Sequence, residues 1–395
     1  MHILLGLLAV VVVLGLAFLM SNDKKNVNYK AIGIMFIFQI LITLFMFETG
    51  VGQWVIKKIS EGFNKLIEFG NVGIGFVVGG FELQEGGVFF FNVLLLIVFF
   101  ATLLSVLTYL KILPPIIKYL GWLISKVTGL PRVESFNAVN SVFFGQSEAL
   151  IAIRSQFHHL NANRLYIVSA SAMGSVSASI VGAYLQMLPP QYVLVALPLN
   201  MFSALMIASV IAPVNVPKEE DVVDIKNVSK EKSIFEAMGN GALEGGKIAL
   251  IVAAMLIAFI ASLELVNALI QLVFAGVTLE DILGYVLAPI GLLMGISPGE
   301  VIQAGSIMGT KIVTNEFVAM LQFQEVMGGM SEKTIGIVTV FLTSFANFSS
   351  IGIIAGTVKG IDEEKAVSVS RFGMKLLIGA TLASILSASV VGMFL

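Results

Sequence analysis

The chain has 395 residues, of which 57% are hydrophobic and only 12% are charged, and its mean hydropathy is +0.96. Soluble globular proteins carry about 25% charged residues, so this composition excludes an ordinary soluble enzyme and indicates an integral membrane protein. The net charge of −2 leaves no polybasic surface for nucleic acid, and the lack of cysteine excludes disulfides and thiolate metal sites. Three histidines, at His2, His158 and His159, are too few and too clustered for a histidine metal site.

Apolar runs long enough to cross a bilayer, which takes roughly 20 residues, recur along the chain. We predict eight spans, which in chain order are 3–20, 31–47, 88–110, two within 165–217 divided at Pro189 and Pro190, 248–270, 334–358 and 376–395. Residues 53–69 have the pattern of an amphipathic helix in the membrane interface. Lys and Arg gather in loops that fall on one side if both termini lie outside, which the positive-inside rule favours.

Two segments, 131–157 and 298–323, are moderately apolar yet contain several polar and charged residues. Each has the length of two short helices and a turn. Each precedes a span rich in polar residues, which is followed by a span without them. The predicted topology gives the two copies opposite orientations, which is the pattern of an inverted repeat around a site at the membrane midplane. The predicted fold class is therefore an all-α polytopic membrane protein with eight transmembrane helices, two re-entrant hairpins, an interfacial helix and broken helices.

This organisation predicts four units. Two form a scaffold, residues 1–120 with the first three spans and residues 218–295 with a cytoplasmic loop and the sixth span. The other two, 121–217 and 296–395, each contain one hairpin and the two spans that follow it, and we interpret them as the transport halves.

The first hairpin contains Gly145, followed by Gln146, Ser147 and Glu148. Glycine permits a sharp turn, and the three polar side chains then offer donors and acceptors next to each other. An ionisable group at membrane depth is costly, so it usually faces a cavity. The alternative is that 131–157 is a cytoplasmic loop in which Glu148 is solvated.

The second hairpin contains the lone carboxylate Glu316. An ionised carboxylate can accept hydrogen bonds from neighbouring hydroxyls of a sugar, whereas a protonated one can carry a coupling proton. The alternative is a salt bridge with Lys311. The span that follows is interrupted at 345–352, where Asn347 and the serines can bind substrate hydroxyls, replace lost backbone bonds or pack against other helices.

Three motifs, in this order and spacing, resemble the concentrative nucleoside transporter family. They are the GQSE cluster at 145–148, NEFVAM at 315–320 and FANFSSIG at 345–352, and the resemblance extends from about residue 89 to the C-terminus. It implies a homotrimer in the lipid bilayer of a bacterial inner membrane, with one pathway in each subunit and no cofactor. It also implies symport of nucleosides by alternating access, for which we expect pyrimidine nucleosides such as uridine, with adenosine as the second candidate.

The resemblance assigns roles to eight side chains. Gln146, Ser147 and Glu148 are expected to bind the nucleobase, directly or through water, and Ile180 is expected to pack against it as an apolar side chain. Those expected at the ribose are Glu316, Asn347 and Ser350, with Phe345 packing on the base or the ribose.

The coupling ion depends on one position in the first hairpin. Sodium-coupled members of the family have an asparagine five residues before the motif glutamine, and here that position is Ser141. We therefore predict proton coupling through Glu316 or Glu148, because proton-coupled bacterial members resemble this sequence better. The sodium alternative would use Ser141, Phe144, Ser175 and Val176 as ion ligands.

Two other functional classes are possible for this composition. A membrane-embedded hydrolase could use Glu148 and Glu316, but no histidine or cysteine lies near either carboxylate in the sequence to hold a metal. A channel is also possible, although two halves with broken helices are typical of alternating access.

Overall fold

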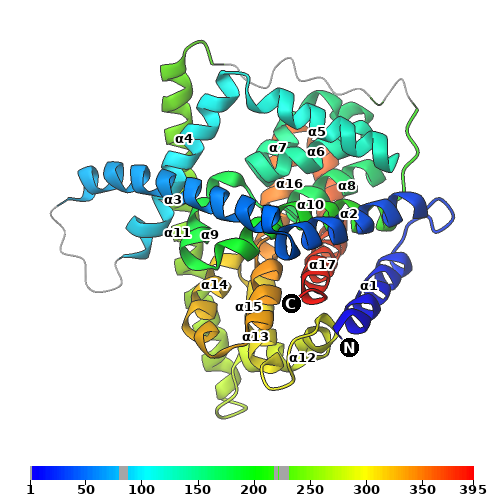
Figure 1. Ribbon diagram of the computed structural model, residues 1–395, viewed down its shortest axis with the longest axis vertical. Coiled ribbons are helices and arrows are strands. Elements are labelled where there is room, and N and C mark those ends of the chain that lie inside the picture. The colour runs from blue at the N-terminus through cyan, green and yellow to red at the C-terminus, as the bar shows by residue number, and fades with distance from the viewer. Residues whose placement is uncertain (1, 80–87, 218–220, 222–230) are drawn as a thin grey trace.

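The computed structural model describes residues 2–79, 88–217, 221 and 231–395, and every regular element in these residues is helical (Figure 1). The N-terminal elements are α1 (His2–Leu19), α2 (Tyr29–Glu48), α3 (Gly50–Val78), the π-helical turn η1 (Phe90–Leu94), α4 (Leu96–Tyr109) and α5 (Leu113–Thr128). The next group is α6 (Arg132–Phe144), α7 (Gln146–Ala152), η2 (Arg154–His159), α8 (Ala162–Met173), α9 (Ala178–Met187) and α10 (Pro190–Ile211). The C-terminal elements are α11 (Ile234–Gln271), α12 (Leu279–Met294), α13 (Val301–Val313), α14 (Glu316–Val326), η3 (Met327–Gly329), α15 (Glu332–Leu342), α16 (Phe348–Ile361) and α17 (Glu363–Gly392).

The all-helical fold is confirmed, and six helices in the described part of the chain are long and apolar enough to cross a membrane. The number of spans and the re-entrant course of the hairpins remain predictions. Residues 218–220 and 222–230 of the predicted cytoplasmic loop after the fifth span lie outside the described residues. The residues predicted as an interfacial helix lie within the longer helix α3, which has Ile56 and Ile67 on its buried side and two exposed Lys–Glu ion pairs, Lys58–Glu61 and Lys65–Glu68. Its position in the membrane interface remains a prediction.

Several boundaries differ from the sequence prediction. The short helices α5 and α12 lie in segments predicted as loops, and α11 and α17 each begin more than ten residues before the predicted span. The helices α5 and α12 have only 16 residues each, which is below the length that identifies a span. The early turns of α11 and α17 contain charged residues such as Glu244 and Lys365, which a search for apolar runs leaves out.

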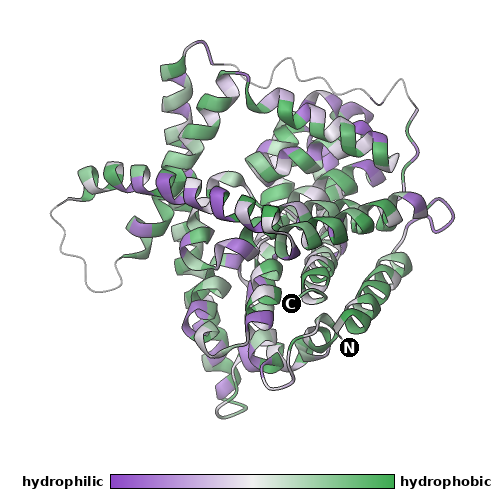
Figure 2. Ribbon diagram, in the orientation of Figure 1, coloured by the Kyte–Doolittle hydropathy of each residue, from purple (hydrophilic) through white to green (hydrophobic). Residues whose placement is uncertain are grey.

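The centre of the molecule is built from α8, α10 and α17, which pack against one another (Figure 1). Most residues of these helices are buried, whereas the outer helices expose apolar side chains. Figure 2 shows α1 and α2 coloured as hydrophobic along most of their length, and Val11, Leu41 and Ile257 are exposed examples on α1, α2 and α11. Apolar surface of this extent is typical of helices that face lipid or a neighbouring subunit.

The two halves repeat their helix pattern with a constant spacing. Helices α7, α8 and α9 begin at residues 146, 162 and 178, and α14, α15 and α16 begin at 316, 332 and 348, so each pair of starts differs by 170. The caps repeat as well. Asn161 and Ser331 accept from the third residue of α8 and α15, and Ser177 and Asn347 cap α9 and α16. The sequence therefore contains two copies of one unit, each a hairpin followed by a broken helix.

Candidate functional site

The breaks in the two broken helices meet at the centre of the protein. The first break lies between α8 and α9, the second lies between α15 and α16, and the backbone N–H of Phe345 donates to the carbonyl of Ser175 across them (3.1 Å). Asn200 on α10 donates to the carbonyls of Val340 and Thr343, which are among those left unpaired at the end of α15. Backbone polar groups in the breaks thus find protein partners, as non-helical backbone inside a membrane requires.

Glu316 lies beside this crossing at the first residue of α14 and is only 5% exposed. Its Oε1 accepts from the Tyr184 hydroxyl (2.9 Å), and its Oε2 accepts from the Asn347 amide (2.8 Å). The carboxylate therefore connects the second hairpin to both broken helices. It also lies at the N-terminal ends of α14 and α16, where the helix dipoles favour negative charge.

Asn347 is the residue around which the second break is organised. While its amide nitrogen donates to Glu316, its Oδ1 accepts from the backbone N–H of Ser350 (3.0 Å) and the hydroxyl of Ser349 (2.7 Å). The structure therefore brings together Glu316, Asn347 and Ser350. Phe345, which is buried, lies two residues earlier in the same break.

The side chain of Lys311 does not form the salt bridge considered as an alternative. Its Nζ donates to the hydroxyl of Ser344 (2.8 Å) and lies 4.6 Å from the centre of the Phe341 ring. Lys311 is near the end of α13 and Glu316 starts α14, so the turn between them directs the two side chains to different partners.

The tip of the first hairpin, formed by α6 and α7, turns at Gly145, whose φ of +87° is in the region that favours glycine. Gln146 is buried next to this turn, and the hydroxyl of Ser147 accepts from Thr357 of α16 (2.9 Å). Asn137, on the first arm, donates to the carbonyl of Val168 (2.9 Å). The segment therefore folds as two helices that pack against α8 and α16 and not as an irregular loop, and Glu148 itself is half-buried.

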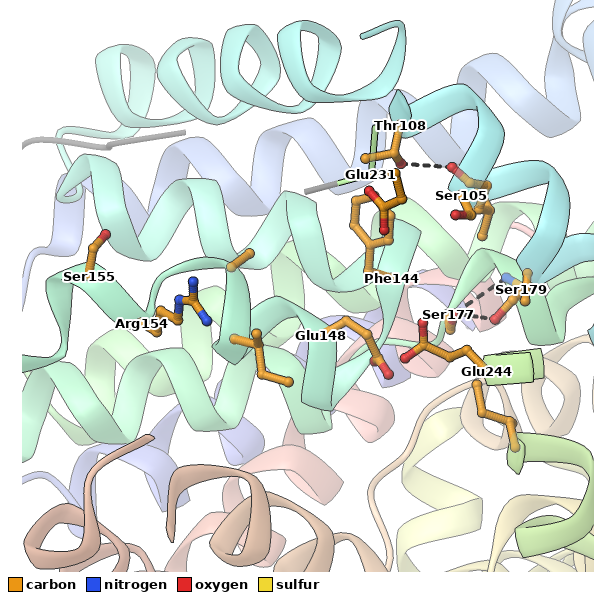
Figure 3. Close-up of a pocket in the computed structure, with 15 residues that line it drawn as sticks. Ser105, Thr108, Phe144, Glu148, Arg154, Ser155, Ser177, Ser179, Glu231 and Glu244 are labelled. Carbon is orange, nitrogen blue, oxygen red and sulfur yellow. Dashed lines mark hydrogen bonds between the residues drawn. The ribbon is translucent and has the colours of Figure 1, made fainter. Parts of the chain in front are cut away.

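Glu148 lines a cavity of about 370 Å³ beside this hairpin, together with Phe144 and Ser177 (Figure 3). Its walls come from α4, the first hairpin, η2, the first break and α11, and not from the second hairpin. Figure 3 shows the carboxylate of Glu148 directed toward that of Glu244 on α11, and Glu231 and Arg154 also line the space. The volume is within the range of roughly 300–1,000 Å³ that is usual for small-molecule sites.

The residues predicted for a sodium site are placed around the first break. Ser141 and Ser175 are buried, and their hydroxyls donate to the carbonyls of Asn137 (2.7 Å) and Ala172 (3.1 Å). Phe144 ends α6 and Val176 lies within the break. Each serine hydroxyl thus makes a local hydrogen bond to a carbonyl three or four residues earlier in the chain.

Two residues of this region, Tyr184 and Glu244, were not predicted from the sequence. Tyr184 lies one turn after Ile180 on α9 and is 132 positions from Glu316 in the chain. A tyrosine hydroxyl in an apolar span needs a hydrogen-bond partner, and this is the one signal in the sequence that could have identified it. Glu244 could not be found in this way because the predicted span began after it.

Comparison with known proteins agrees with this architecture along the whole chain. Three family models match in succession, described as "Na+ dependent nucleoside transporter N-terminus" over residues 8–81, "Nucleoside recognition" over 90–191 and "Na+ dependent nucleoside transporter C-terminus" over 192–392. The purine nucleoside transport protein NupG of Bacillus subtilis is 38% identical over 395 residues, covering 100% of both chains.

Solved structures of CNTnw are similar in fold. An inward-facing, substrate-bound state superimposes with a TM-score of 0.95 at 29% identity and covers 100% of this chain and 98% of that one. A CNTnw variant in an outward-facing state gives a TM-score of 0.94 at 28% identity, covering 100% and 99%. The matched families and relatives are nucleoside transporters and not enzymes, which excludes the hydrolase. The chain belongs to the concentrative nucleoside transporter family.

Proposed function

We propose that this transporter imports nucleosides across a bacterial inner membrane by alternating access, driven by the proton gradient. The observation that carries the proposal is the buried Glu316–Asn347 pair at the break of the second repeat. The carboxylate accepts one protein hydrogen bond at each oxygen, so a lone pair on each remains for the hydroxyls of a ribose. The similarity to CNTnw structures in inward-facing and outward-facing states supports alternating access.

The first hairpin supplies the base end of this proposed site. Gln146 is buried and its Oε1 has no hydrogen-bond partner among the described residues. A buried acceptor without a partner is costly, and an N–H group of a nucleobase would satisfy it. Ser147 and Glu148 contribute from the next two positions of α7, and Ile180 and Phe345 provide the apolar surfaces on which a flat ring packs.

For the base we propose purine nucleosides, with adenosine as the first to test. This choice is supported by the relative described as a purine nucleoside transport protein, which aligns over its whole length. The sequence prediction of pyrimidine nucleosides is the competing outcome. Uptake of labelled adenosine into proteoliposomes, with competition by guanosine, uridine and cytidine, decides between the two classes. Stronger competition by uridine than by guanosine would contradict the purine assignment.

Proton coupling is the proposed driving force. Ser141 is shorter than the asparagine of sodium-coupled relatives, so its oxygen does not reach as far toward an ion, whereas a proton needs only one buried carboxylate. We expect uptake to follow an imposed inward proton gradient and to be nearly unchanged when choline replaces sodium. We also expect Ser141→Asn not to confer sodium dependence by itself, because Phe144, Ser175 and Val176 must also present oxygens. A sodium requirement at constant pH and membrane potential would contradict proton coupling.

Tyr184→Phe is expected to weaken nucleoside binding by roughly fivefold, the scale of one hydrogen bond worth about 1 kcal/mol, because Glu316 loses the donor that orients it. The matched control is Tyr192→Phe, which removes a similar hydrogen bond to Glu332 (3.0 Å) that involves none of the motif residues. Isothermal titration of both variants measures the difference. Equal losses in the two variants would show that Tyr184 has no special link to the substrate.

The homotrimer and the outward position of both termini complete the proposal. The termini lie together, since Gly6 on α1 faces the side chain of Met393, which places them on the same side of the protein. Helix α3 projects from the body in Figure 1 and exposes Val72, Phe76 and Val77, apolar side chains that a neighbouring subunit or lipid would cover. Native mass spectrometry of the detergent-purified protein is expected to give a trimer, and a monomer at all concentrations would contradict it.

A further inference from the structure

Lys311 is a fully buried lysine that the proposed transport mechanism does not use. Its side chain is 0% exposed, and among the described residues no carboxylate lies within salt-bridge distance of its Nζ. The ammonium instead donates to the hydroxyl of Ser344 and faces the ring of Phe341. Ser344 in turn contacts the hydroxyl of Ser384 on α17 (2.8 Å). A charge inside a membrane protein is costly to bury, so its retention points to a role.

The surroundings of Lys311 are suited to a cation. It occupies the last turn of α13, and Ser344 lies two residues beyond the end of α15. The C-terminal ends of two helices therefore converge on the ammonium, and each carries partial negative charge. Glu316 has the complementary position at the N-terminal starts of α14 and α16. The second repeat thus places one basic and one acidic side chain according to the helix dipoles.

The first repeat differs at this position. With the spacing of 170 residues, the counterparts of Lys311 and Ser344 are Ser141 and Gly174. Neither is charged, although α6 and α8 also end there. The two repeats therefore share one backbone plan, and only the second contains a cationic side chain at this position.

We propose that the ammonium of Lys311 is a built-in cation that binds the end of α13 to the break between α15 and α16. It thereby holds Asn347 and the start of α14 in the relative position that presents Glu316 to the substrate. Lys311 is a positioning residue in this scheme, because its hydrogen bond goes to Ser344 and it acts on the substrate through Glu316 and Asn347. The expected effect of Lys311 on nucleoside binding rests on the proposed function. The link that Lys311 makes between α13 and the break does not depend on it.

Chemical rescue tests the positive charge separately from the space that the side chain fills. Lys311→Ala removes the four atoms that correspond to propylammonium, and Lys311→Met removes the charge while keeping a chain of similar length. Equilibrium binding of labelled adenosine to the detergent-purified protein is measured with propylammonium chloride or 1-propanol added, at constant ionic strength. Binding assays avoid the collapse of pH gradients that amines cause in vesicles.

Both variants are expected to bind adenosine roughly tenfold more weakly or worse, the scale of one lost hydrogen bond from a charged donor. Propylammonium is expected to restore several-fold tighter binding to Lys311→Ala, whereas 1-propanol, which fills the same space without charge, restores none. Lys311→Met leaves no room and is expected not to respond. The control is Lys333→Ala on α15, whose Nζ has no hydrogen-bond partner among the described residues and which is expected to bind normally.

Two results would overturn the inference. One is unchanged binding by Lys311→Met, and the other is equal rescue of Lys311→Ala by 1-propanol. If the wild type binds no nucleoside, the proposed function fails, but the built-in cation is still tested by thermal unfolding. Propylammonium should then raise the melting temperature of Lys311→Ala and not that of the wild type. The absence of this difference would refute the cation role on its own.

Discussion

Glu316→Gln is expected to reduce nucleoside binding and uptake by roughly 100-fold or more, since two charge-assisted hydrogen bonds to ribose hydroxyls contribute about 1.5–3 kcal/mol each. The replacement amide also has an NH₂ donor in place of one of the two carboxylate oxygens, both of which accept hydrogen bonds in the structure. The amide NH₂ would face either the hydroxyl of Tyr184 or the NH₂ of Asn347, and the latter cannot accept a hydrogen bond. The loss of the carboxyl group would in addition remove the proposed proton carrier.

The matched control for this variant is Glu332→Gln, which changes the same chemistry in the Tyr192–Glu332 pair outside the proposed site. Uptake by the purified variants in proteoliposomes and their melting temperatures are measured side by side. We expect Glu332→Gln to transport at close to the wild-type rate and Glu316→Gln to remain folded without transporting. Wild-type uptake by Glu316→Gln would remove Glu316 from the substrate site.

Asn347→Ala is expected to have the second largest effect, and mainly on the substrate. It removes the cap on the backbone of Ser350, which costs about 1 kcal/mol of stability, and leaves Oε2 of Glu316 without its donor. The unpaired oxygen lowers stability further, and Glu316 loses the donor that orients it toward the substrate. A hydrogen bond to a charged group is worth about 1.5–3 kcal/mol, so binding should fall by roughly 10–100-fold.

Asn161→Ala provides the comparison for Asn347→Ala because Asn161 caps α8 in the same way, by accepting from the backbone of Arg164 (3.0 Å), without a contact to Glu316. Thermal unfolding and adenosine binding are measured for both variants. The expected pattern is a larger loss of melting temperature in Asn347→Ala, which also leaves an oxygen of Glu316 unpaired, and weakened binding in Asn347→Ala alone. A large loss of stability with normal affinity per folded molecule would make Asn347 a structural cap only.

The sequence was sufficient to predict features that depend on local patterns. The hairpins, the break near Asn347 and the glycine turn at Gly145 were all predicted because Gly, Asn and Ser in apolar segments indicate interrupted helices. The helices α5 and α12 were missed because a helix of 16 residues that contains charged residues and prolines is shorter and less uniformly apolar than a span.

Contacts between residues that are far apart in the chain required the structure. Tyr184 and Glu316 come together only because the two repeats cross at their breaks. Lys311 and Glu316 are near in the sequence, which suggested an ion pair, but they belong to the opposite ends of two helices. The spacing of 170 residues between the repeats also required the structure. The helix starts and caps repeat at this spacing, but most side chains at equivalent positions differ, so the sequence alone does not show it.

The proposal as a whole is that this chain is a nucleoside carrier whose substrate site includes Glu316. Counterflow tests it most directly. Proteoliposomes are loaded with unlabelled adenosine, diluted into a trace of labelled adenosine without any ion gradient, and sampled over time. A carrier that alternates its access exchanges the two pools, so wild-type vesicles should accumulate label transiently above equilibrium, and Glu316→Gln vesicles should not. Label that only equilibrates in wild-type vesicles, or an equal overshoot with Glu316→Gln, would contradict the account.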